Sequence, residues 1–252
     1  MKLAVAGKGG SGKTSIAGTL ARLLGRQGYR VLAIDGDSNP NLALTLGIPA
    51  ERMNDIPALP RDLLHRTNGG VELSKDVEEI RASHSLSGPD GVILLVMAHP
   101  RPEEAGTGCL CGMHATVRTL IESTTDDDSD VTVLDTEASP EHLTRGTAKY
   151  AETMLTVVEP YFKSLETGRR MAALAGDLGV KRVSLVANKV RDARELAAIR
   201  EFAEKHGLEI AGVIPYDESF PEAEREAVAP LDKSPDTPAI EAIAEVARNV
   251  AG

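Results

Sequence analysis

The chain has 252 residues, of which 42% are hydrophobic and 26% charged, so it can build a substantial core beneath a polar surface. Its formal net charge of −10 argues against broad binding to nucleic acid or to anionic membranes. Aromatic residues make up only 3% and tryptophan is absent, which disfavours recognition of single-stranded nucleic acid by base stacking.

Short apolar runs alternate with longer helical patterns along the whole chain. The runs are continuously apolar, which is typical of parallel strands covered on both faces. We expect strands at residues 2–6, 31–35, 92–97, 131–135, 154–158, 184–188 and 210–214. We expect helices at residues 14–27, 114–123, 164–178, 193–206 and 238–250. Right-handed connections predict one α/β domain over residues 1–252, with a doubly wound, mostly parallel sheet of about seven strands and helices on both faces.

Two stretches lie outside this pattern. Residues 54–89 have mixed polarity, and we interpret them as helices and loops inserted before the third strand. Residues 126–130 carry an acidic cluster, which we interpret as a solvated loop rather than a cation site. The longest apolar run, residues 92–98, is too short to span a bilayer, and the first strand leaves no room for a secretory signal. We therefore expect a cytoplasmic protein.

The first expected strand leads into a glycine-rich segment that fits the phosphate-binding pattern G-x-x-x-x-G-K-[ST] and precedes a helix. The glycines allow backbone N–H groups to turn toward phosphate oxygens at the helix start. Lys13 is expected to neutralise the β- and γ-phosphates, and the Thr14 hydroxyl to ligate Mg²⁺. The predicted ATP-binding segment is Gly7, Lys8, Gly9, Gly10, Ser11, Gly12, Lys13, Thr14 and Ser15.

Lys8 adds a second lysine directly after the first glycine, which an ordinary P-loop does not require. The pattern G-K-G-G-x-G-K-T resembles the deviant P-loop of the MinD, ParA and nitrogenase-iron-protein superfamily of ATPases. The resemblance implies a nucleotide-sandwich homodimer in which Lys8 of each protomer reaches the phosphates bound by the other. ATP binding and dimerisation would then be one coupled event. The alternative is a solvated surface lysine.

Aspartates end two of the expected strands, at the edge where the phosphates should lie. Asp35 and Asp37 follow the second strand, and Asp135 ends the fourth. By the resemblance, Asp37 is the switch I aspartate that orients the attacking water and contacts the Mg²⁺ shell. Asp135 is similarly the Walker B aspartate that holds Mg²⁺, and Asp35 matches a further acidic position. Each could instead be a turn or strand-end aspartate, and Ser38 stands where ParA-like members have proline.

Two later strand ends predict a purine pocket. Asn188 and Lys189 resemble the adenine-recognition position of the superfamily, where an amide can both donate and accept hydrogen bonds. Pro215, Tyr216 and Asp217 follow the last strand and resemble the loop whose backbone packs around the base. Either segment alone could be a plain boundary between strand and turn. Together they favour ATP as the ligand.

The only two cysteines, Cys109 and Cys111, form a C-x-C motif flanked by glycines. A disulfide across one residue would be strained, and the cytosol disfavours it. Two small buried hydrophobic residues are another alternative. We interpret the motif as a thiolate site for a transition metal, completed by four sulfurs on the twofold axis of a dimer. Thiolates alone would take Zn²⁺ or Cu(I), and His114 is a further candidate ligand.

A narrower resemblance follows when the C-x-C motif is taken with other segments, namely residues 141–147, residues 157–160 and the Asn188 segment. Together they resemble the CooC-type ATPases, nickel-insertion accessory proteins of carbon monoxide dehydrogenase, over nearly the whole chain. The resemblance implies an ATPase in which hydrolysis to ADP and phosphate, using Lys8, Lys13 and Asp37, drives delivery of Ni²⁺ to a client metalloenzyme. The pair Ser139-Pro140 departs from that family's pattern of glycine followed by an aliphatic residue, which concerns the geometry of switch II.

Three alternatives remain open at this point. The chain could be an ATP-driven iron–sulfur electron donor similar to the nitrogenase iron protein, or a nucleotide sensor without catalysis. It could also be a positioning ATPase similar to ParA or MinD, acting on DNA or a membrane. The last predicted helix is acidic and weakly amphipathic, unlike the basic helix that ends MinD-like proteins. We therefore expect binding neither to membranes nor to nucleic acid.

Overall fold

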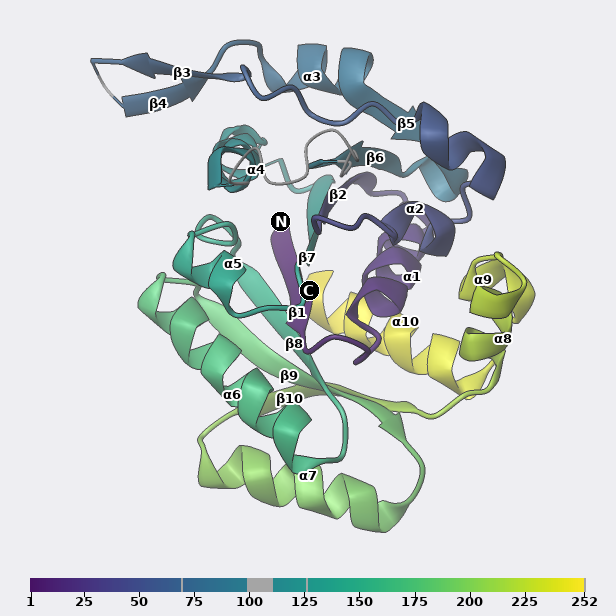
Figure 1. Ribbon diagram of the computed structural model, residues 1–252. Coiled ribbons are helices and arrows are strands. Elements are labelled where there is room, and N and C mark those ends of the chain that lie inside the picture. Colours follow the sequence, from purple (N-terminus) through teal and green to yellow (C-terminus); the bar gives the residue numbers. More distant parts are fainter. Residues whose placement is uncertain (69, 99–110, 126, 252) are drawn as a thin grey trace.

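The computed structural model in Figure 1 describes residues 1–68, 70–98, 111–125 and 127–251. Within them, eight strands form one sheet in the order β10-β9-β8-β1-β7-β2-β6-β5, and β3 and β4 form a separate hairpin. All neighbours in the sheet are parallel except β5, which runs antiparallel to β6 at the edge. The strands are β1 (Lys2–Gly7), β2 (Arg30–Gly36), β3 (Leu64–Thr67), β4 (Gly70–Leu73), β5 (Ser85–Ser87), β6 (Ile93–Val96), β7 (Asp130–Thr136), β8 (Thr153–Val158), β9 (Arg182–Val190) and β10 (Glu209–Pro215).

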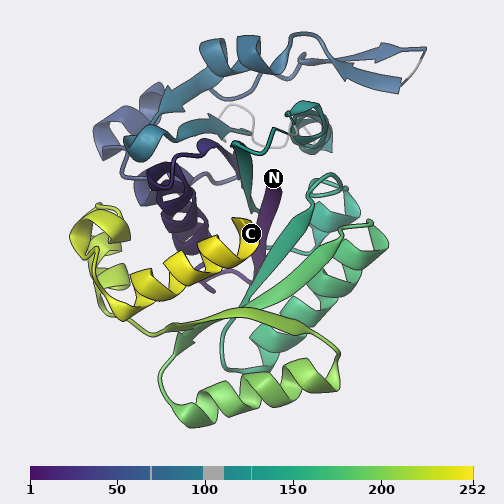
Figure 2. The ribbon, with the colours of Figure 1, turned by 180° about the vertical axis from the view of Figure 1, so that it is seen from behind.

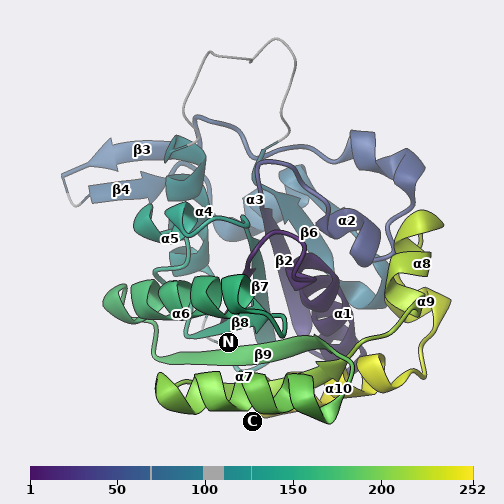
Figure 3. The same cartoon turned by 60° about the horizontal axis from the view of Figure 1, so that its bottom comes forward.

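Helices cover both faces of the sheet, so that the strands are buried on two sides. Figure 2 shows α1 and α10 together on one face, and Figure 3 shows α4, α5, α6 and α7 on the other. The helices are α1 (Lys13–Arg26), α2 (Leu42–Thr45), η1 (Ala50–Asp55), α3 (Val77–His84), η2 (Pro89–Gly91), α4 (Cys111–Ser123), α5 (Glu141–Thr144), α6 (Phe162–Asp177), α7 (Ala193–Lys205), α8 (Ser219–Arg225), α9 (Pro230–Lys233) and α10 (Pro238–Ala251).

Strand β1 contributes apolar side chains to the cores on both faces of the sheet. Successive side chains of a strand point to opposite sides. Leu3 and Val5 belong to the core under α1 and α10, while Ala4 and Ala6 belong to the core under α4 and α6. All four are buried, which explains why the run is continuously apolar.

The structure confirms the predicted fold class, a mostly parallel sheet between two helical layers. Every predicted strand and helix has a counterpart, although several bounds differ by a few residues. The interpretation of residues 54–89 was incomplete, because this stretch also contains the β3–β4 hairpin and the edge strand β5. The hairpin strands are largely exposed, and β5 has three residues, so neither carries an apolar pattern long enough to identify it.

Helices α1 and α2 pack closely against each other beside the candidate site. A side chain at Gly18 would begin 2.3 Å from the hydroxyl oxygen of Thr45, so only glycine lets the two helices approach this closely. The Thr45 hydroxyl lies 3.3 Å from the backbone carbonyl of Thr14 and donates to it. The segment that follows β2 is thereby fixed to the first turn of α1.

No helix in the described part of the chain is both long enough and apolar enough to cross a membrane.

Candidate active site

Three adjacent strands bring the predicted phosphate and magnesium residues to one edge of the sheet. Asp135 on β7 pairs in register with Val5 on β1 and with Asp35 on β2. Strand β1 runs directly into the loop at residues 8–12, and β2 into the switch I loop at residues 37–41. Since the carboxyl ends of parallel strands meet at one edge, all three segments face the start of α1.

The P-loop is shaped by its own backbone. Ser11 N–H donates to the Lys8 carbonyl (3.0 Å), and Ile16 N–H donates to the Gly12 carbonyl (3.0 Å), which joins the loop to α1. Gly10 and Gly12 have φ angles of 81° and 90°, a left-handed conformation that glycine adopts without strain. The loop therefore presents backbone N–H groups at a helix N-terminus, which is a favourable site for an anion.

Two side chains of β9 hold the P-loop through hydrogen bonds to its carbonyl groups. The Asn188 Nδ2 atom donates to the Ser11 carbonyl (2.7 Å), and Lys189 Nζ donates to the Gly10 carbonyl (2.5 Å). Glu159 accepts from Lys189 (2.9 Å) and so fixes its direction. Part of the Asn188 amide, which we expected to read the base, is thus used to position the phosphate loop.

Lys13 lies among the carboxylates that were predicted to bind magnesium. Its Nζ atom is 3.5 Å from Asp37 Oδ2 and 4.0 Å from Asp135 Oδ1, and it donates to the Thr14 hydroxyl at 3.3 Å. The Asp135 Oδ1 atom is buried and has no hydrogen-bond partner among the described residues. Hydroxyl and carboxylate oxygens at one place, one of them an unpaired acceptor, form a donor set that suits Mg²⁺.

Burial dominates the protonation of the two strand-end aspartates. It raises the pKa of Asp135 to about 7, with Lys13 acting against the rise and Asp35 adding to it. Burial also raises the pKa of Asp35 to about 6, although hydrogen bonds from the backbone of Leu42, Asp37 and Asn41 oppose the change. Lys13 faces two carboxylates here, and Asp35 adds to the negative charge around Asp135, so a further cation would be stabilised at this point.

Asp35 has a different role from that of its neighbour. Its carboxylate accepts the backbone N–H groups of Asn41 (2.8 Å), Leu42 (2.8 Å) and Asp37 (3.1 Å). It therefore folds the switch I loop back onto the end of β2. Asp37 is the aspartate of this pair that lies near Lys13, and its other oxygen accepts from Asn39 N–H (2.9 Å).

A cavity of about 710 Å³ opens beside the P-loop. Its lining includes Gly10, Gly12, Lys13, Thr14, Ser15, Asn188, Lys189, Pro215, Tyr216 and Asp217 from the predicted set. Gly7, Lys8, Gly9 and Ser11 do not line it, and neither do Asp37 and Asp135. Apolar side chains of the segment around α8 also line it, namely Phe220, Pro221 and Val228. A cavity of this volume, lined both by phosphate-binding backbone and by apolar side chains, suits a nucleotide.

Sequence reasoning missed two residues that shape this cavity. Arg191 stacks over the Tyr216 ring, with its guanidinium carbon 4.0 Å from the ring centroid. Glu159 was noted only as part of a family pattern, and it proves to be the partner of Lys189. The proximity of Arg191 to the Asn188-Lys189 pair in the sequence was the one signal that could have identified it.

Lys8 faces away from this cavity, toward the start of α6. Its Nζ atom lies 5.8 Å from the centroid of the Tyr161 ring, within range of a cation–π contact. The Tyr161 hydroxyl donates to Glu159 Oε2 (2.6 Å), and this bond raises the pKa of Tyr161 to about 12. The neighbouring Phe162 is a large apolar side chain that is 72% exposed.

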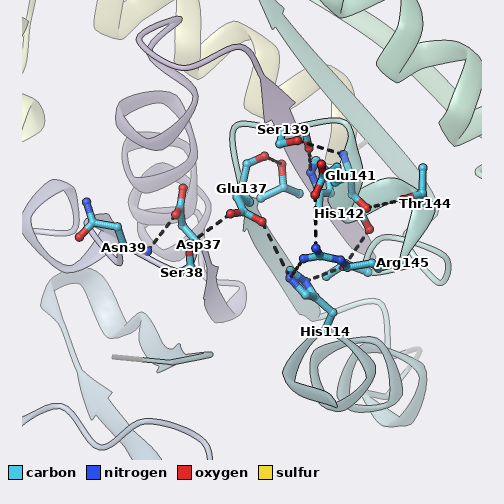
Figure 4. Close-up of polar contacts among 12 residues, drawn as sticks. Asp37, Ser38, Asn39, His114, Glu137, Ser139, Glu141, His142, Thr144 and Arg145 are labelled. Atoms are coloured by element: carbon cyan, nitrogen blue, oxygen red, sulfur yellow. Dashed lines mark hydrogen bonds and ion pairs between the residues drawn. The ribbon is translucent and has the colours of Figure 1, made fainter. Parts of the chain in front are cut away.

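The switch II loop, residues 137–140, contacts switch I and α4 through the side chain of Glu137. Figure 4 shows Glu137 between Ser38 of switch I and His114 of α4. The Ser38 hydroxyl donates to Glu137 Oε1 (3.2 Å), and Glu137 Oε2 is 3.9 Å from His114 Nε2. Beyond the loop, His142 is buried and its Nδ1–H donates to the Ser139 carbonyl.

His114 is buried, and both of its ring nitrogens have protein partners, so the structure does not support it as a metal ligand. Nδ1 is 3.0 Å from the Thr147 hydroxyl and Nε2 is 3.1 Å from an Arg145 nitrogen. Arginine can only donate, so Nε2 must accept and Nδ1 must carry the proton. Burial and Arg145 lower the pKa of His114, while Glu137 opposes the change.

The C-x-C motif is only partly within the described residues. Cys109 lies outside them, and Cys111 is the first residue of α4, where it is exposed. The sulfur of Cys111 is disulfide-bonded in this structure, contrary to our expectation that such a bond would be disfavoured. The described residues contain no group of three or more His, Cys, Asp or Glu side chains arranged for a metal ion.

Comparison with known proteins gives the family. The model of the CobQ/CobB/MinD/ParA nucleotide binding domain matches residues 2–231. The chain is 35% identical over 244 residues to the carbon monoxide dehydrogenase accessory protein CooC of Rhodospirillum rubrum, covering 93% of this chain and 91% of that protein. It is 36% identical over 232 residues to an uncharacterized ATP-binding protein of Methanocaldococcus jannaschii, covering 89% and 88%.

Solved structures agree in fold at lower identity. The septum site-determining protein MinD of Pyrococcus horikoshii, complexed with Mg-ADP, superposes with a TM-score of 0.75 at 20% identity, over 99% of this chain and 95% of that one. A ParA family ATPase of Chlorobium tepidum superposes with a TM-score of 0.74 at 19% identity, over 98% and 97%. With its P-loop at the edge of a mostly parallel sheet, the chain belongs to the CobQ/CobB/MinD/ParA family of nucleotide-binding P-loop proteins.

Proposed function

We propose that this protein is an ATP-dependent metallochaperone, in which ATP binding pairs two copies and the pair holds a transition metal through Cys109 and Cys111. The main supporting observation is the phosphate end of the cavity, where Lys13 lies within 4.0 Å of two carboxylates beside a backbone cradle. The 35% identity to a CooC protein over nearly the whole chain supports the metal-delivery part of the proposal.

ATP would place its phosphates on the P-loop and its base against the apolar side chains of the cavity. The backbone N–H groups of residues 9–15 and the Lys13 ammonium group would bind the phosphates. Pro215, Tyr216 and Asp217 also line the cavity, and the base would lie against them. The oxygen of the Asn188 amide would serve as an acceptor for the amino group of adenine.

Thr14, Asp37 and Asp135 would hold Mg²⁺ at the phosphate end. A bound Mg²⁺ neutralises charge on the phosphate oxygens during phosphoryl transfer. Asp37 is the carboxylate placed to orient the attacking water, because its side chain remains partly exposed while that of Asp135 is buried. Lys13 would then pair with the phosphate oxygens instead of the two aspartates.

The position of Lys8 supports a role in contacting the phosphates bound by a second copy of the chain. Lys8 does not line the cavity of its own chain, and it rests on the Tyr161 ring beside the exposed Phe162. A cation held at the surface next to a phosphate site can reach the phosphates of a second copy related by a twofold axis. We propose that this pairing requires ATP and brings the C-x-C motifs of two copies together.

The metal site would need both cysteines as thiolates, so metal binding would require the reduced protein. Four sulfurs from two copies satisfy a four-ligand site. We propose Ni²⁺ as the cargo, with Zn²⁺ as the competing ion, and a metalloenzyme such as carbon monoxide dehydrogenase as the client. In this reaction the metal is the cargo, and hydrolysis of ATP would release it.

The test is a metal titration of reduced protein with Mg²⁺ and a non-hydrolysable ATP analogue. We expect one Ni²⁺ per two chains, sedimentation as a dimer, and loss of the metal in a Cys109→Ser/Cys111→Ser variant. Lys8→Ala should bind nucleotide yet stay monomeric, whereas Lys181→Ala, which changes an exposed lysine before β9, should behave as the parent. Unchanged metal binding in the double serine variant would refute the C-x-C site.

The same preparation tests the rival functions. A brown protein isolated without oxygen, with a visible iron–sulfur spectrum and two copies per cluster, would favour the electron donor. Binding to DNA or to anionic vesicles that depends on ATP would favour a positioning ATPase. ATP turnover that persists in Asp37→Ala would contradict the hydrolytic role given to that residue.

A further inference from the structure

A line of polar side chains connects the switch I loop to the helix that begins at Cys111. Ser38 bonds to one oxygen of Glu137 (3.2 Å), and the other oxygen of Glu137 lies 3.9 Å from His114 on α4 (Figure 4). We infer that Glu137 and His114 are positioning residues that transmit the state of switch I to the first turn of α4. This inference rests on the proposed function, because it assigns a means of regulation to the same site.

His114 is suited to this role because its Nε2 atom faces two groups with opposite requirements. Arg145 lies 3.1 Å away and needs a lone pair on Nε2, whereas Glu137 lies 3.9 Å away and could bond only to an N–H there. One nitrogen cannot satisfy both at once. A small shift of Glu137 toward or away from the ring would therefore select between two discrete arrangements rather than deform one of them.

The buried position of His114 makes such a change reach the rest of α4. Nδ1 is bonded to the Thr147 hydroxyl, which in turn donates to the His142 carbonyl. The ring is thus enclosed between α4 and the segment that follows α5. Cys111 lies one turn before His114, and residues three apart are neighbours on a helix. The exposed first turn of α4 is consequently supported from below by His114 and the buried Met113.

The other end of the line lies next to the nucleotide site. Ser38 directly follows Asp37, whose carboxylate is 3.5 Å from Lys13 Nζ. If Asp37 joins a magnesium ion and Lys13 turns to phosphate oxygens, the segment that carries Ser38 must adjust. Its hydroxyl bond to Glu137 is the direct contact between the side chains of switch I and switch II in the described residues.

The test uses Cys111 as its own reporter. In a Cys109→Ser background, Cys111 is the sole thiol, and its rate of alkylation by iodoacetamide reports the first turn of α4. We expect the rate to differ between Mg·ADP and a Mg-bound non-hydrolysable ATP analogue by roughly 5-fold or more, the usual lower range of coupling between sites. In Ser38→Ala and Glu137→Gln, the ratio of the two rates should fall to within about twofold.

A matched control is available in the same loop region. Glu141→Gln removes the charge of an exposed glutamate four residues after Glu137. Glu141 pairs with Arg145 at 3.3 Å and has no contact with Ser38. It should keep the parent ratio of alkylation rates. Nucleotide affinity and sedimentation, measured for each variant, show whether binding and pairing are intact. Ser38→Ala and Glu137→Gln change the two partners of one hydrogen bond, so agreement between them guards against a folding defect in either one.

The outcomes separate this inference from the proposed function. A Cys109→Ser protein whose Cys111 reacts equally in both nucleotide states overturns the inference, as does the addition of Glu137→Gln if that protein binds nucleotide and keeps the full ratio. Failure of the protein to bind metal would instead refute the proposed function, and it would leave the alkylation ratio unaffected. Partial recovery of the ratio in Glu137→Asp, relative to Glu137→Gln, would support a role for the carboxylate charge.

Discussion

The loop between β1 and α1 is shaped by its own backbone and braced by Asn188 and Lys189, whereas the segment from β7 to α5 contacts switch I and α4 through side chains. In the first region, two left-handed glycines and backbone hydrogen bonds set the shape. In the second, Glu137, His114 and Arg145 form contacts across three separate parts of the chain. The two regions meet at Lys13, Asp37 and Asp135.

This difference indicates a division of labour. A backbone cradle has one favourable conformation, so it can bind phosphate without reorganising. Side-chain contacts between loops can exchange partners at little cost, and they are the kind of element that switches between states. The next four predictions probe the two regions, from the largest expected effect to the smallest.

Replacing Lys13 should have the largest effect and should be confined to the phosphate region. Lys13→Gln removes the charge that faces Asp37 and Asp135, and it leaves those carboxylates without their cation. We expect ATP affinity, measured by calorimetry, to fall by about 30- to 1,000-fold, in line with about 2–4 kcal/mol for a charged contact. A loss below about threefold would show that the backbone alone binds the phosphates.

His142 should make the switch II region sensitive to acid. Burial lowers the pKa of His142 to about 4, against an ordinary value of 6.5. Between these two pH values His142 is protonated in the unfolded chain but stays neutral in the folded chain. The free energy of unfolding therefore falls as the pH falls from 6.5 to 4. Relative to His142→Asn, the parent should lose up to about 3 kcal/mol of unfolding free energy over this range. Urea denaturation at several pH values measures it, and parallel pH profiles would contradict it.

Two glycine substitutions separate conformation from crowding in the P-loop. Gly10→Ala and Gly12→Ala both place a side chain at a positive φ, but only at position 12 would it meet a neighbour, Asn188 Nδ2 at 2.4 Å. We expect Gly10→Ala to cost about 1 kcal/mol and Gly12→Ala about 2–3 kcal/mol in unfolding free energy. Equal costs would show that Asn188 moves aside freely.

The smallest effect is expected at the exposed end of the second region. Glu141 pairs with Arg145 at 3.3 Å, and its side chain is 72% exposed. Glu141→Gln should change the unfolding free energy by less than about 0.5 kcal/mol, because solvent screens such pairs. A cost above 1 kcal/mol in thermal or chemical denaturation would mean that Arg145 depends on Glu141 to hold His114.

The sequence was most informative where function depends on adjacent residues. The P-loop pattern encodes a continuous stretch of backbone, and continuous apolar runs identify parallel strands. The resemblance singled out Asp37, but it gave no role to Asp35, and only the fold shows that Asp35 accepts three backbone N–H groups while Asp37 faces Lys13. The edge strand β5 was missed because three residues paired to one neighbour carry no periodic signal.

The contacts of switch II could not be predicted for a related reason. Ser38, Glu137 and His114 are far apart in the sequence, and none belongs to a short motif that would link them. His114 was considered as a metal ligand because it follows the cysteines, and its burial against Thr147 and Arg145 appears only in three dimensions.

The bond from Asn188 to Ser11 has a consequence for how this site could change over evolution. The residue expected to meet the purine also braces the phosphate cradle, and its amide occupies the space that a side chain at Gly12 would need. A mutation at position 188 that altered the preferred base would also remove the hydrogen bond to the P-loop, and so weaken binding of the triphosphate. New nucleotide preferences should therefore arise through the outer wall formed by Arg191 and Tyr216, where such a penalty is absent.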